Sequence, residues 1–458
     1  MIRKVSILIY SISVFILSCN NNATWPGLNK EEFGSGGGII VGKDYRLPKG
    51  SLSQYEQRQD LDPNDTAKVL FRKGDYGSKY FRIPALITTK KGTILAASDR
   101  RYEKTADLGK SSKMDVIVRR SEDLGNTWTE PVVVAKVATG PSDSYGDAFF
   151  INAHNGDVIL GVIYDPGFQS AAKTVLYRSS DEGKTWREIH SFMPSQLDSS
   201  IQRGFAASGQ GLTLRHGDNA GKKRLMFAYL GVTSAGIQVF TYISEDDGNT
   251  WRAGGKSKVD GNFDETKAFE LANGRVMLNH RRAVRLGKRG WSIDSTFGGD
   301  FNYLGEDPEV QDPGNNADLS RYEYDGVPIV QNGEKYALFI NANADAVGQW
   351  FTARKNHTVR LTHNDFSDGN GNQNGKYKYT KQLVRGGESL FSGYPTITVL
   401  PDGTIGTLTE ETTDGSVTDG YDLVFRRFNL YWLSDGAEAV DYNSGLRFQE
   451  KRGDNILQ

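Results

Sequence analysis

Ser121-Glu-Asp-Leu-Gly-Asn-Thr-Trp128 decides the fold, because the chain repeats this phrase twice more. The further copies are Ser179-Ser-Asp-Glu-Gly-Lys-Thr-Trp186 and Ser244-Glu-Asp-Asp-Gly-Asn-Thr-Trp251. The copies start 58 residues apart (121 to 179) and then 65 residues apart (179 to 244). A period of that size indicates repeated supersecondary units, so it bears on the fold before any other pattern.

Each copy has the chemistry of a hairpin turn. Asp folds its carboxylate back onto nearby backbone N–H groups, and Gly adopts the positive φ that other residues resist. Trp follows as a large apolar anchor, and a short β-type run precedes each copy, at 116–118, 174–177 and 239–243. The pattern predicts turns that cap strand pairs. It predicts a structural role, because the phrase repeats whereas an active site occurs once.

The same alternation of strands and glycine turns continues from about residue 65, with Asn-Gly and Asp-Gly before β-branched runs at 155–160, 273–278 and 402–405. Worn copies of the phrase stand at 295–299 and 362–365. Roughly 390 residues divided by a unit of about 65 gives about six units. We therefore predict one all-β domain over 65–458, a six-bladed β-propeller of four-stranded antiparallel blades.

Composition excludes several classes of partner. The chain has 458 residues and a formal net charge of −1, so no basic excess indicates nucleic-acid binding. The histidines show no HExxH-type spacing and Cys19 is the single cysteine, so we expect no metal site, no cofactor and no disulfide. The long polar turn at 365–375 is expected to be an exposed loop rather than a calcium site.

The N-terminus is typical of an exported protein. Arg3 and Lys4 precede an apolar run at 5–17 that is too short to span a bilayer, which predicts a signal peptide over 1–18. Ile16-Leu-Ser-Cys19 resembles a bacterial lipobox, which would make Cys19 a lipidated residue; an ordinary cleaved signal is the alternative. Residues 19–64 are then a flexible tether. We expect a membrane-anchored lipoprotein, periplasmic or at the cell surface, in the outer membrane of a Gram-negative bacterium.

Phe81-Arg-Ile-Pro84, Asp99-Arg-Arg101 and the phrase at 121 follow one another in an order that resembles the bacterial exo-sialidases. These neuraminidases are glycoside hydrolases with Asp-box (BNR) repeats, and the resemblance extends over residues 70–435. It implies a sialidase-type propeller that acts as a monomer on the terminal sialic acids of glycoproteins, glycolipids and oligosaccharides.

The resemblance also implies an arginine clamp. Sialic acid carries a carboxylate at its anomeric carbon, and arginine offers a charged, bidentate fork for a carboxylate. The family uses three arginines for this purpose, and they match Arg82, Arg281 and Arg354. Arg360 is the alternative for the third position, and Arg282 competes weakly with Arg281.

The family's nucleophile is a neutral tyrosine, because a carboxylate nucleophile would be repelled by the substrate's own anion. The matching residue is Tyr394 in Ser392-Gly-Tyr-Pro395, although the family more often has Ala before this tyrosine and Ser after it. A free phenol has a pKa near 10 and needs a base. Glu265 matches that base, because it stands sixteen residues before Arg281 as in the family; Glu270 could be confused with it.

The remaining family residues surround this centre. Asp107 matches the general acid, six residues beyond Arg101, with Asp99 as a structural alternative. Glu410 matches the residue that orients the first arginine, with Glu411 as alternate. Arg101 and Asp147 match contacts to the sugar's 4-hydroxyl and N-acyl side, and Asp115 is a less specific candidate for the same shell.

The resemblance thus implies an exo-α-sialidase that hydrolyses with retained configuration through a covalent glycosyl-tyrosine. Three alternatives stay open: a weak or inactive sialoglycan-binding propeller, a trans-sialidase, and another propeller glycosidase with two catalytic carboxylates. The arginine set and the apparent Tyr, Glu and Asp argue against the first and the third. Linkage preference does not follow from these residues.

Overall fold

The structure is a computed structural model. The chain divides into two compact units, 1–41 and 42–458, and all described residues belong to the second. The described residues are 44–108, 113–137, 143–167, 172–257, 263–283, 287–345, 353–367, 376–387, 390–412, 420–441 and 447–450. The predicted signal peptide, Cys19 and the first part of the predicted tether lie outside these residues.

Short strands make up most of the described chain. The first half contains β1 (Asp44–Leu47), β2 (Lys68–Phe71), β3 (Tyr80–Thr88), β4 (Ile94–Arg101), β5 (Met114–Ser121), β6 (Val132–Ala135), β7 (Ser144–Asn152), β8 (Val158–Asp165), β9 (Lys173–Ser179), β10 (Arg187–Phe192), β11 (Arg203–Ala206), β12 (Gly209–Gln210), β13 (Leu212–Thr213), β14 (Leu225–Thr233) and β15 (Gly236–Ser244). The second half contains β16 (Arg252–Lys256), β17 (Phe263–Glu270), β18 (Val276–Arg282), β19 (Arg289–Asp294), β20 (Phe301–Glu306), β21 (Ala317–Arg321), β22 (Glu323–Tyr324), β23 (Val327–Pro328), β24 (Ala337–Ala342), β25 (His357–Thr362), β26 (Tyr379–Gln382), β27 (Ser392–Val399), β28 (Ile405–Glu411), β29 (Asp422–Phe428) and β30 (Arg447–Glu450).

The helices are short. They are η1 (Glu56–Arg58), η2 (Asp75–Gly77), α1 (Pro194–Leu197), η4 (Gly217–Asn219) and α2 (Leu430–Leu433). Within the described residues, none of the helices has the length and the apolar character needed to cross a bilayer.

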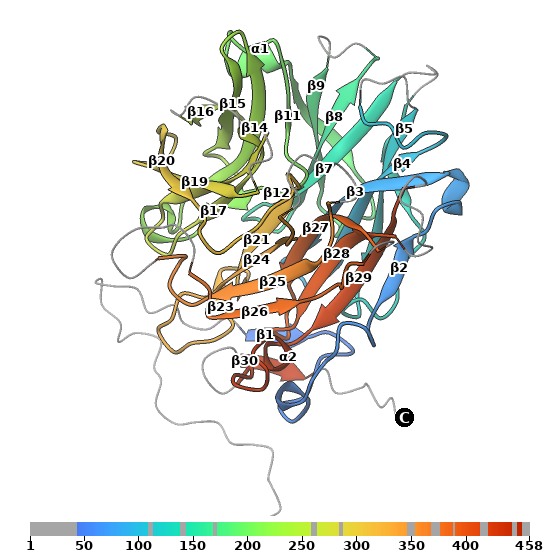
Figure 1. Cartoon of the computed structure of the whole chain (residues 1–458), viewed down its shortest axis with the longest axis vertical. Helices are drawn as coiled ribbons and strands as arrows, with labels where there is room; N and C mark the ends of the chain where they lie inside the picture. Colours follow the sequence, from blue (N-terminus) through green and yellow to red (C-terminus); the bar gives the residue numbers. More distant parts are fainter. Residues whose placement is uncertain are drawn as a thin grey trace, which may run out of the picture. The chain divides into compact units, whose positions relative to one another are not determined.

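Most of the strands form antiparallel sheets, and the inner strands of these sheets contact one another in a closed series. Three sheets have four strands each, β17-β18-β19-β20, β2-β29-β28-β27 and β21-β24-β25-β26, and a fourth has five, β11-β14-β15-β16 with β13. Strand β3 contacts β7 and β27, β27 contacts β21, β21 contacts β17, and β17 contacts β14. The series closes because β11 and β13, which pair with β14, also contact β7. Figure 1 shows these inner strands meeting in the middle of the described unit. The prediction of an all-β, propeller-like arrangement is confirmed.

The remaining large sheet differs from the prediction of separate four-stranded blades. It has nine strands and contains two antiparallel runs, β3-β4-β5-β6 and β7-β8-β9-β10, with β12 added beside β7. A single parallel pair, Met114 with Ser144, joins the two runs. One pairing between β5 and β7 is therefore enough to merge what the sequence predicts as two units.

The core lies between neighbouring strand groups. Six clusters of buried apolar residues occur in the described chain, for example Ala85, Val118 and Phe150 between the two runs of the nine-stranded sheet. The inner strands, such as β27 and β28, are buried along their whole length, whereas outer strands such as β20 and β26 are partly exposed. The packing between neighbouring strand groups holds the inner strands at fixed positions around the centre.

The repeated phrases form the predicted turns. In the third copy, the Asp246 carboxylate accepts bonds from the Ser244 hydroxyl (2.9 Å), the Thr250 N–H (2.8 Å) and the Thr250 hydroxyl (2.6 Å). Asp247 and Gly248 have φ of 65° and 82°, and the Trp251 indole donates to the Gly248 carbonyl (3.2 Å). The other two copies repeat these bonds.

One worn copy keeps part of this geometry. Thr362 donates its hydroxyl to the Asn364 side chain (2.8 Å) and accepts the Phe366 N–H (3.2 Å), as Ser244 does for Asp246 and Gly248. Phe366 has a φ of 60° where the intact copies have glycine. The segment at 295–299 makes a different turn, in which the Gly299 N–H donates to the Thr296 carbonyl (2.9 Å).

Part of the predicted tether belongs to the folded unit. Gln57, on η1, is fully buried, and its side-chain amide donates to the Asp402 carbonyl (2.8 Å). The Leu61 N–H donates to the Asn429 side chain (3.3 Å). Residues 44–64 are therefore part of the folded unit: β1 pairs with β30, and Gln57 and Leu61 are bonded beside the sheet of β27–β29. The polar composition alone did not indicate this.

Candidate active site

Beta-bulges at the starts of four inner strands re-aim the candidate residues. The register of β3 shifts between Arg82 and Ala85, and that of β27 shifts between Ser392 and Pro395. The corresponding shifts in β7 and β17 enclose Asp147 and Glu265. A bulge bends its strand and turns a side chain out of the regular alternation, and such bulges are frequent beside active sites. These four bulges therefore direct candidate side chains from different sheets toward a common site.

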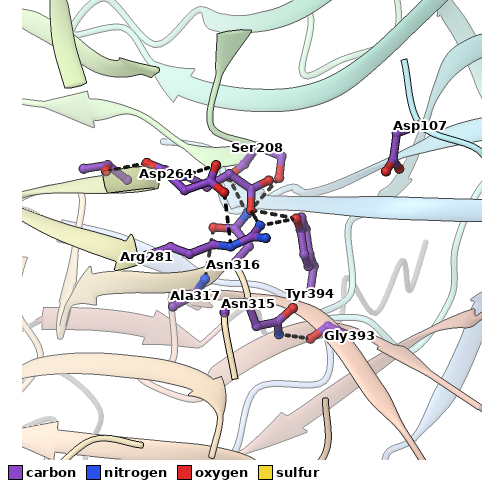
Figure 2. Close-up of polar contacts among 12 residues, drawn as sticks. Asp107, Ser208, Asp264, Arg281, Asn315, Asn316, Ala317, Gly393 and Tyr394 are labelled. Carbon is purple, nitrogen blue, oxygen red and sulfur yellow. Dashed lines mark hydrogen bonds and ion pairs between the residues drawn. The ribbon is translucent and has the colours of Figure 1, made fainter. Parts of the chain in front are cut away.

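Tyr394 and Glu265 form the centre of the site. The phenol oxygen of Tyr394 lies 2.6 Å from Oε2 of Glu265, and Nη1 of Arg281 donates to the phenol at 2.9 Å while it also ion-pairs with Glu265. Figure 2 shows Arg281 reaching toward Tyr394. Burial, followed by the charge of Glu265, raises the pKa of Tyr394 well above its usual value, and the nearby arginines oppose this only in part. The phenol is therefore protonated and donates to the carboxylate.

Glu410 connects the tyrosine strand to the first arginine. Its Oε1 accepts from Nε of Arg82 (2.7 Å) and from the Ile83 N–H (2.7 Å), and its Oε2 accepts the Tyr394 N–H (2.9 Å). Burial alone would lower the pKa of Arg82, but the charges of Glu410 and Asp107, together with the hydrogen bond to Glu410, outweigh burial and raise that pKa. The alternative, Glu411, instead pairs with Arg426.

The three arginines of the expected clamp line one cavity of ≈ 380 Å³ together with Tyr394. The guanidinium carbons of Arg82 and Arg354 lie 5.7 Å and 5.3 Å from the Tyr394 ring centroid. The alternative Arg360 does not line this cavity, because its guanidinium donates to Asn341 (2.8 Å) and Asn343 (2.9 Å).

Asp107 lies at the edge of the same cavity. Its side chain is 62% exposed, with Oδ1 3.0 Å from Nη1 of Arg101 and 4.0 Å from Nη1 of Arg82. Figure 2 shows it set apart from the group around Tyr394 and Arg281. Asp107 can therefore meet a group that projects from the cavity toward solvent.

Asp99 and Asp115, unlike Asp107, are buried and bonded to other groups of the protein. Asp99 is fully buried, ion-pairs with Arg101 (2.9 Å) and accepts the Asp147 N–H (3.1 Å); burial raises its pKa to about 6 although Arg101 opposes the shift. Asp115 is also buried, accepts from Tyr102 (2.7 Å), and does not line the cavity.

Asp147 does line the cavity and has a φ of 53°, which is uncommon for a residue other than glycine. Burial, and then the charges of Asp99 and Glu265, raise its pKa well above the usual value for an aspartate. The carboxyl group of Asp147 therefore takes up a proton more readily than an exposed aspartate. It can donate as well as accept a hydrogen bond in the cavity.

A comparison with known families places the chain. It matches the BNR repeat-like domain family over residues 109–406. The chain belongs to that family. The match begins after Arg82 and Asp107 and ends before Glu410, so part of the site lies outside the matched residues.

Relatives of this BNR-family chain include sialidases. The sialidase of Micromonospora viridifaciens is 32% identical over 388 residues, which cover 81% of this chain and 55% of that protein. The sialidase of Bacteroides fragilis is 29% identical over 246 residues, which cover 49% of this chain and 43% of that protein. The chain therefore spans about half the length of these curated relatives.

Solved structures share the fold of this BNR-family chain. A Hadza microbial sialidase aligns with a TM-score of 0.64 at 22% identity and covers 80% of this chain and 69% of its own. The intramolecular trans-sialidase from Ruminococcus gnavus, in complex with oseltamivir carboxylate, aligns with a TM-score of 0.66 at 18% identity and covers 80% and 98%. These likenesses concern the fold.

Sequence reasoning missed several residues of this BNR-family site. Asp264 lines the cavity, with Oδ2 3.5 Å from Nε of Arg281, and its carboxylate accepts the Glu265 N–H (2.8 Å) inside the bulge. An apolar wall faces the cavity from β8, β11, β14 and β15, formed by Ile163, Phe205, Leu230, Val232 and Ile237. Asp264 could have been predicted from the sequence, because it is next to Glu265. The apolar wall could not, because its residues come together only through the packing of separate strands.

The two departures from the family pattern beside Tyr394 have local reasons. A Cβ on Gly393 would lie 2.1 Å from Oε2 of Glu410, so the glycine leaves room for the carboxylate in the position it has here. Pro395 is the first paired residue after the bulge, opposite Thr409, and β27 continues through it. No group of three or more His, Cys, Asp or Glu side chains suited to a metal occurs among the described residues.

Proposed function

We propose that this chain is an exo-α-sialidase that hydrolyses terminal sialic acids from glycoconjugates. The observation that carries the proposal is the buried Tyr394–Glu265 pair, with its 2.6 Å hydrogen bond, in a cavity that three arginines also line. The relatives named sialidases support the same activity. Sialylated glycoproteins, glycolipids and oligosaccharides are the proposed substrates.

The charge arrangement suits a substrate with a carboxylate beside the reacting carbon. Arg82, Arg281 and Arg354 provide fixed positive charge for that carboxylate. An anionic nucleophile would be repelled by the same carboxylate, whereas the Tyr394 phenol is neutral until it reacts. The apolar wall offers a place for uncharged parts of the sugar.

The proposed reaction has two steps. In the first, Tyr394 attacks the anomeric carbon and passes its proton to Glu265, while Asp107 protonates the leaving glycosidic oxygen. In the second, Asp107 takes a proton from water, the water oxygen attacks the anomeric carbon, and the bond to Tyr394 breaks with return of the proton from Glu265. Two inversions give sialic acid with retained configuration.

The proposed activity can be tested with a fluorogenic sialoside and residues 20–458. We expect turnover by the wild-type chain, and a fall in kcat of about 1,000-fold or more in Tyr394→Phe because the nucleophile is lost. Asp107→Ala should lose most activity toward natural glycans and less toward the fluorogenic substrate, whose leaving group needs less protonation. Full activity of Tyr394→Phe would exclude the nucleophile assignment.

A second candidate is intramolecular transfer, which the structural neighbour from Ruminococcus gnavus favours. NMR of the released sugar distinguishes the two, because hydrolysis gives free sialic acid and intramolecular transfer gives an anhydro sugar. Binding of sialosides without turnover would instead favour a sialoglycan-binding propeller.

We further propose that the nine-stranded sheet acts as two blades, which would make a six-bladed propeller of the sialidase type. The single pair between Met114 and Ser144 supports this division. We also propose that Cys19 carries a lipid that anchors an exported monomer to the membrane. Loss of detergent-phase partitioning in Cys19→Ser would support the anchor, and unchanged partitioning would contradict it.

A further inference from the structure

The carbonyl of Gly393, next to the proposed nucleophile, is held by side chains instead of by a neighbouring strand. It lies inside the bulge of β27, where the regular pairing with β28 is interrupted. Nε2 of His357 lies 2.7 Å from this oxygen and Nδ2 of Asn315 lies 2.5 Å from it. Figure 2 shows the Asn315 side chain directed at Gly393 beneath Tyr394.

Both donors are rigidly placed and come from a different sheet. His357 starts β25 and Asn315 precedes β21, and both side chains are fully buried. The Asn315 N–H donates to the Asp312 carboxylate (2.9 Å), and its carbonyl accepts from Arg289 (2.8 Å). Burial lowers the pKa of His357 to about 4, so the imidazole is neutral at neutral pH. The proton of the neutral ring must then be on Nε2, so that Nε2 can donate a hydrogen bond to the Gly393 carbonyl.

The other side of the same peptide is held equally closely. Oε2 of Glu410 accepts the Tyr394 N–H at 2.9 Å, and the missing Cβ of Gly393 leaves room for that carboxylate. The Gly393–Tyr394 peptide thus has both polar groups bonded to buried side chains. The Tyr394 ring has little freedom to move away from Glu265.

We propose that His357 and Asn315 are positioning residues, which hold the Gly393 carbonyl and thereby fix the Tyr394 phenol for attack. The proposal rests on the proposed function, in which Tyr394 is the nucleophile. A displacement of about 1 Å at a reacting group can cost about 100-fold in rate. Loss of either donor should therefore lower kcat much more than it changes KM, because the arginines that bind substrate stay in place.

The test combines variants of both donors with the nucleophile variant. In His357→Phe and Asn315→Leu we expect kcat to fall about 10- to 100-fold with KM changed less than about 3-fold. In a Tyr394→Phe background the same substitutions should change the residual rate less than about 2-fold, because there is no phenol to position. An equal loss in both backgrounds would show a merely structural role and overturn the proposal.

Two further variants separate positioning from folding. His357→Gln keeps an N–H donor and should retain more activity than His357→Phe. Asn219→Leu removes another buried amide, which donates to Glu270 (2.8 Å) and the Gly274 carbonyl (2.7 Å) away from the cavity, and should lower Tm without lowering kcat. A fall in kcat of Asn219→Leu that matches the fall in Asn315→Leu would also overturn the proposal.

A crystal structure of His357→Phe decides the question without any assay. The distance from the Tyr394 phenol to Oε2 of Glu265, 2.6 Å in the wild type, should exceed hydrogen-bonding range in the variant. An unchanged distance would contradict the positioning role even if the wild type hydrolysed sialosides. Absence of turnover by the wild type would count against the proposed function alone.

Discussion

The two ends of the same strands are built in different ways. In the first run of the nine-stranded sheet, Arg82 pairs with Asp99 at one end, and Thr88 pairs with Ile94, which pairs with Ser121, at the other. The end with Arg82 carries the bulge and the candidate site, and the end with Ser121 carries the repeated phrase. The difference teaches that the repeated sequence marks the scaffold, whereas the site consists of residues that occur once.

The two ends also differ in where their hydrogen bonds go. The carboxylate of Asp246 is bonded to residues within four positions along the chain, and the turn is half-exposed. The carboxylate of Glu410 is bonded to Arg82, 328 residues away, and to the Tyr394 N–H, 16 residues away, and it is fully buried. A substitution at the first end should therefore change stability, and one at the second end should change catalysis.

After removal of the Tyr394 phenol itself, the largest effect is expected for Gly393→Ala. The added Cβ would lie 2.1 Å from Oε2 of Glu410 and would displace the carboxylate that bonds both Arg82 and the Tyr394 N–H. We expect kcat/KM for a sialoside to fall about 1,000-fold, because the clamp and the nucleophile are disturbed together. Steady-state kinetics on the purified variant measure this.

Gly387→Ala is the matched control, because its Cβ would meet no atom closer than 3.8 Å. Its kinetics should equal those of the wild type. Wild-type kinetics in Gly393→Ala would mean that Glu410 can move without consequence, and the contrast between the two ends of the strands would lose its main support.

The turns could be predicted from the sequence because their contacts are local. Ser244, Asp246 and Thr250 bond within seven residues, so the residue types and their spacing contain the structure. The choice of Arg354 over Arg360 came from the family resemblance, and the structure brings Arg354 and not Arg360 to the cavity.

The clamp on Gly393 could not be predicted, because its donors are distant in the chain. Asn315 and His357 stand 78 and 36 residues before Gly393, and no motif joins them. Their contact depends on the way two sheets pack side by side. For the same reason, the sequence does not predict the pairing of Met114 with Ser144, which merges two predicted units into one sheet.

The next effect concerns acid stability and His357. Its pKa is about 4 in the folded protein and about 6.5 when unfolded, so the unfolded chain binds the extra proton between these values. The stability from keeping His357 neutral is present above pH 6.5 and is lost as the pH falls toward 4. We expect this loss to be about 3 kcal/mol.

Urea unfolding of the wild type and His357→Gln at pH 4, 5 and 6.5 measures this contribution. The variant should lose less stability than the wild type over this range, because glutamine does not titrate. Another buried histidine, His280, is present in both proteins, so its own lowered pKa cancels in the difference. Parallel pH curves would contradict the account.

A smaller effect is expected at the other end of the strands, in Asp246→Ala. The substitution removes three hydrogen bonds within a half-exposed turn, which should destabilise the fold by about 1–2 kcal/mol. Kinetics should be unchanged, because the turn follows Ser244, which pairs with Leu225, at the end of β14 opposite to Leu230 and Val232, which line the cavity. Asp123→Ala and Asp181→Ala should behave alike, and a loss of kcat in any folded variant of the three would contradict the division between scaffold and site.

The smallest effect is expected in the worn turn, for Asn364→Asp. Oδ1 of Asn364 accepts from the Thr362 hydroxyl (2.8 Å), which a carboxylate would keep, but Nδ2 donates to the Ser367 carbonyl (2.6 Å), which a carboxylate would repel. We therefore expect a loss of about 1 kcal/mol in urea unfolding, although the change restores the residue type of the intact phrase. A gain in stability would show that the worn turn still favours a carboxylate, and that the intact and worn copies differ by one residue instead of by their whole set of partners.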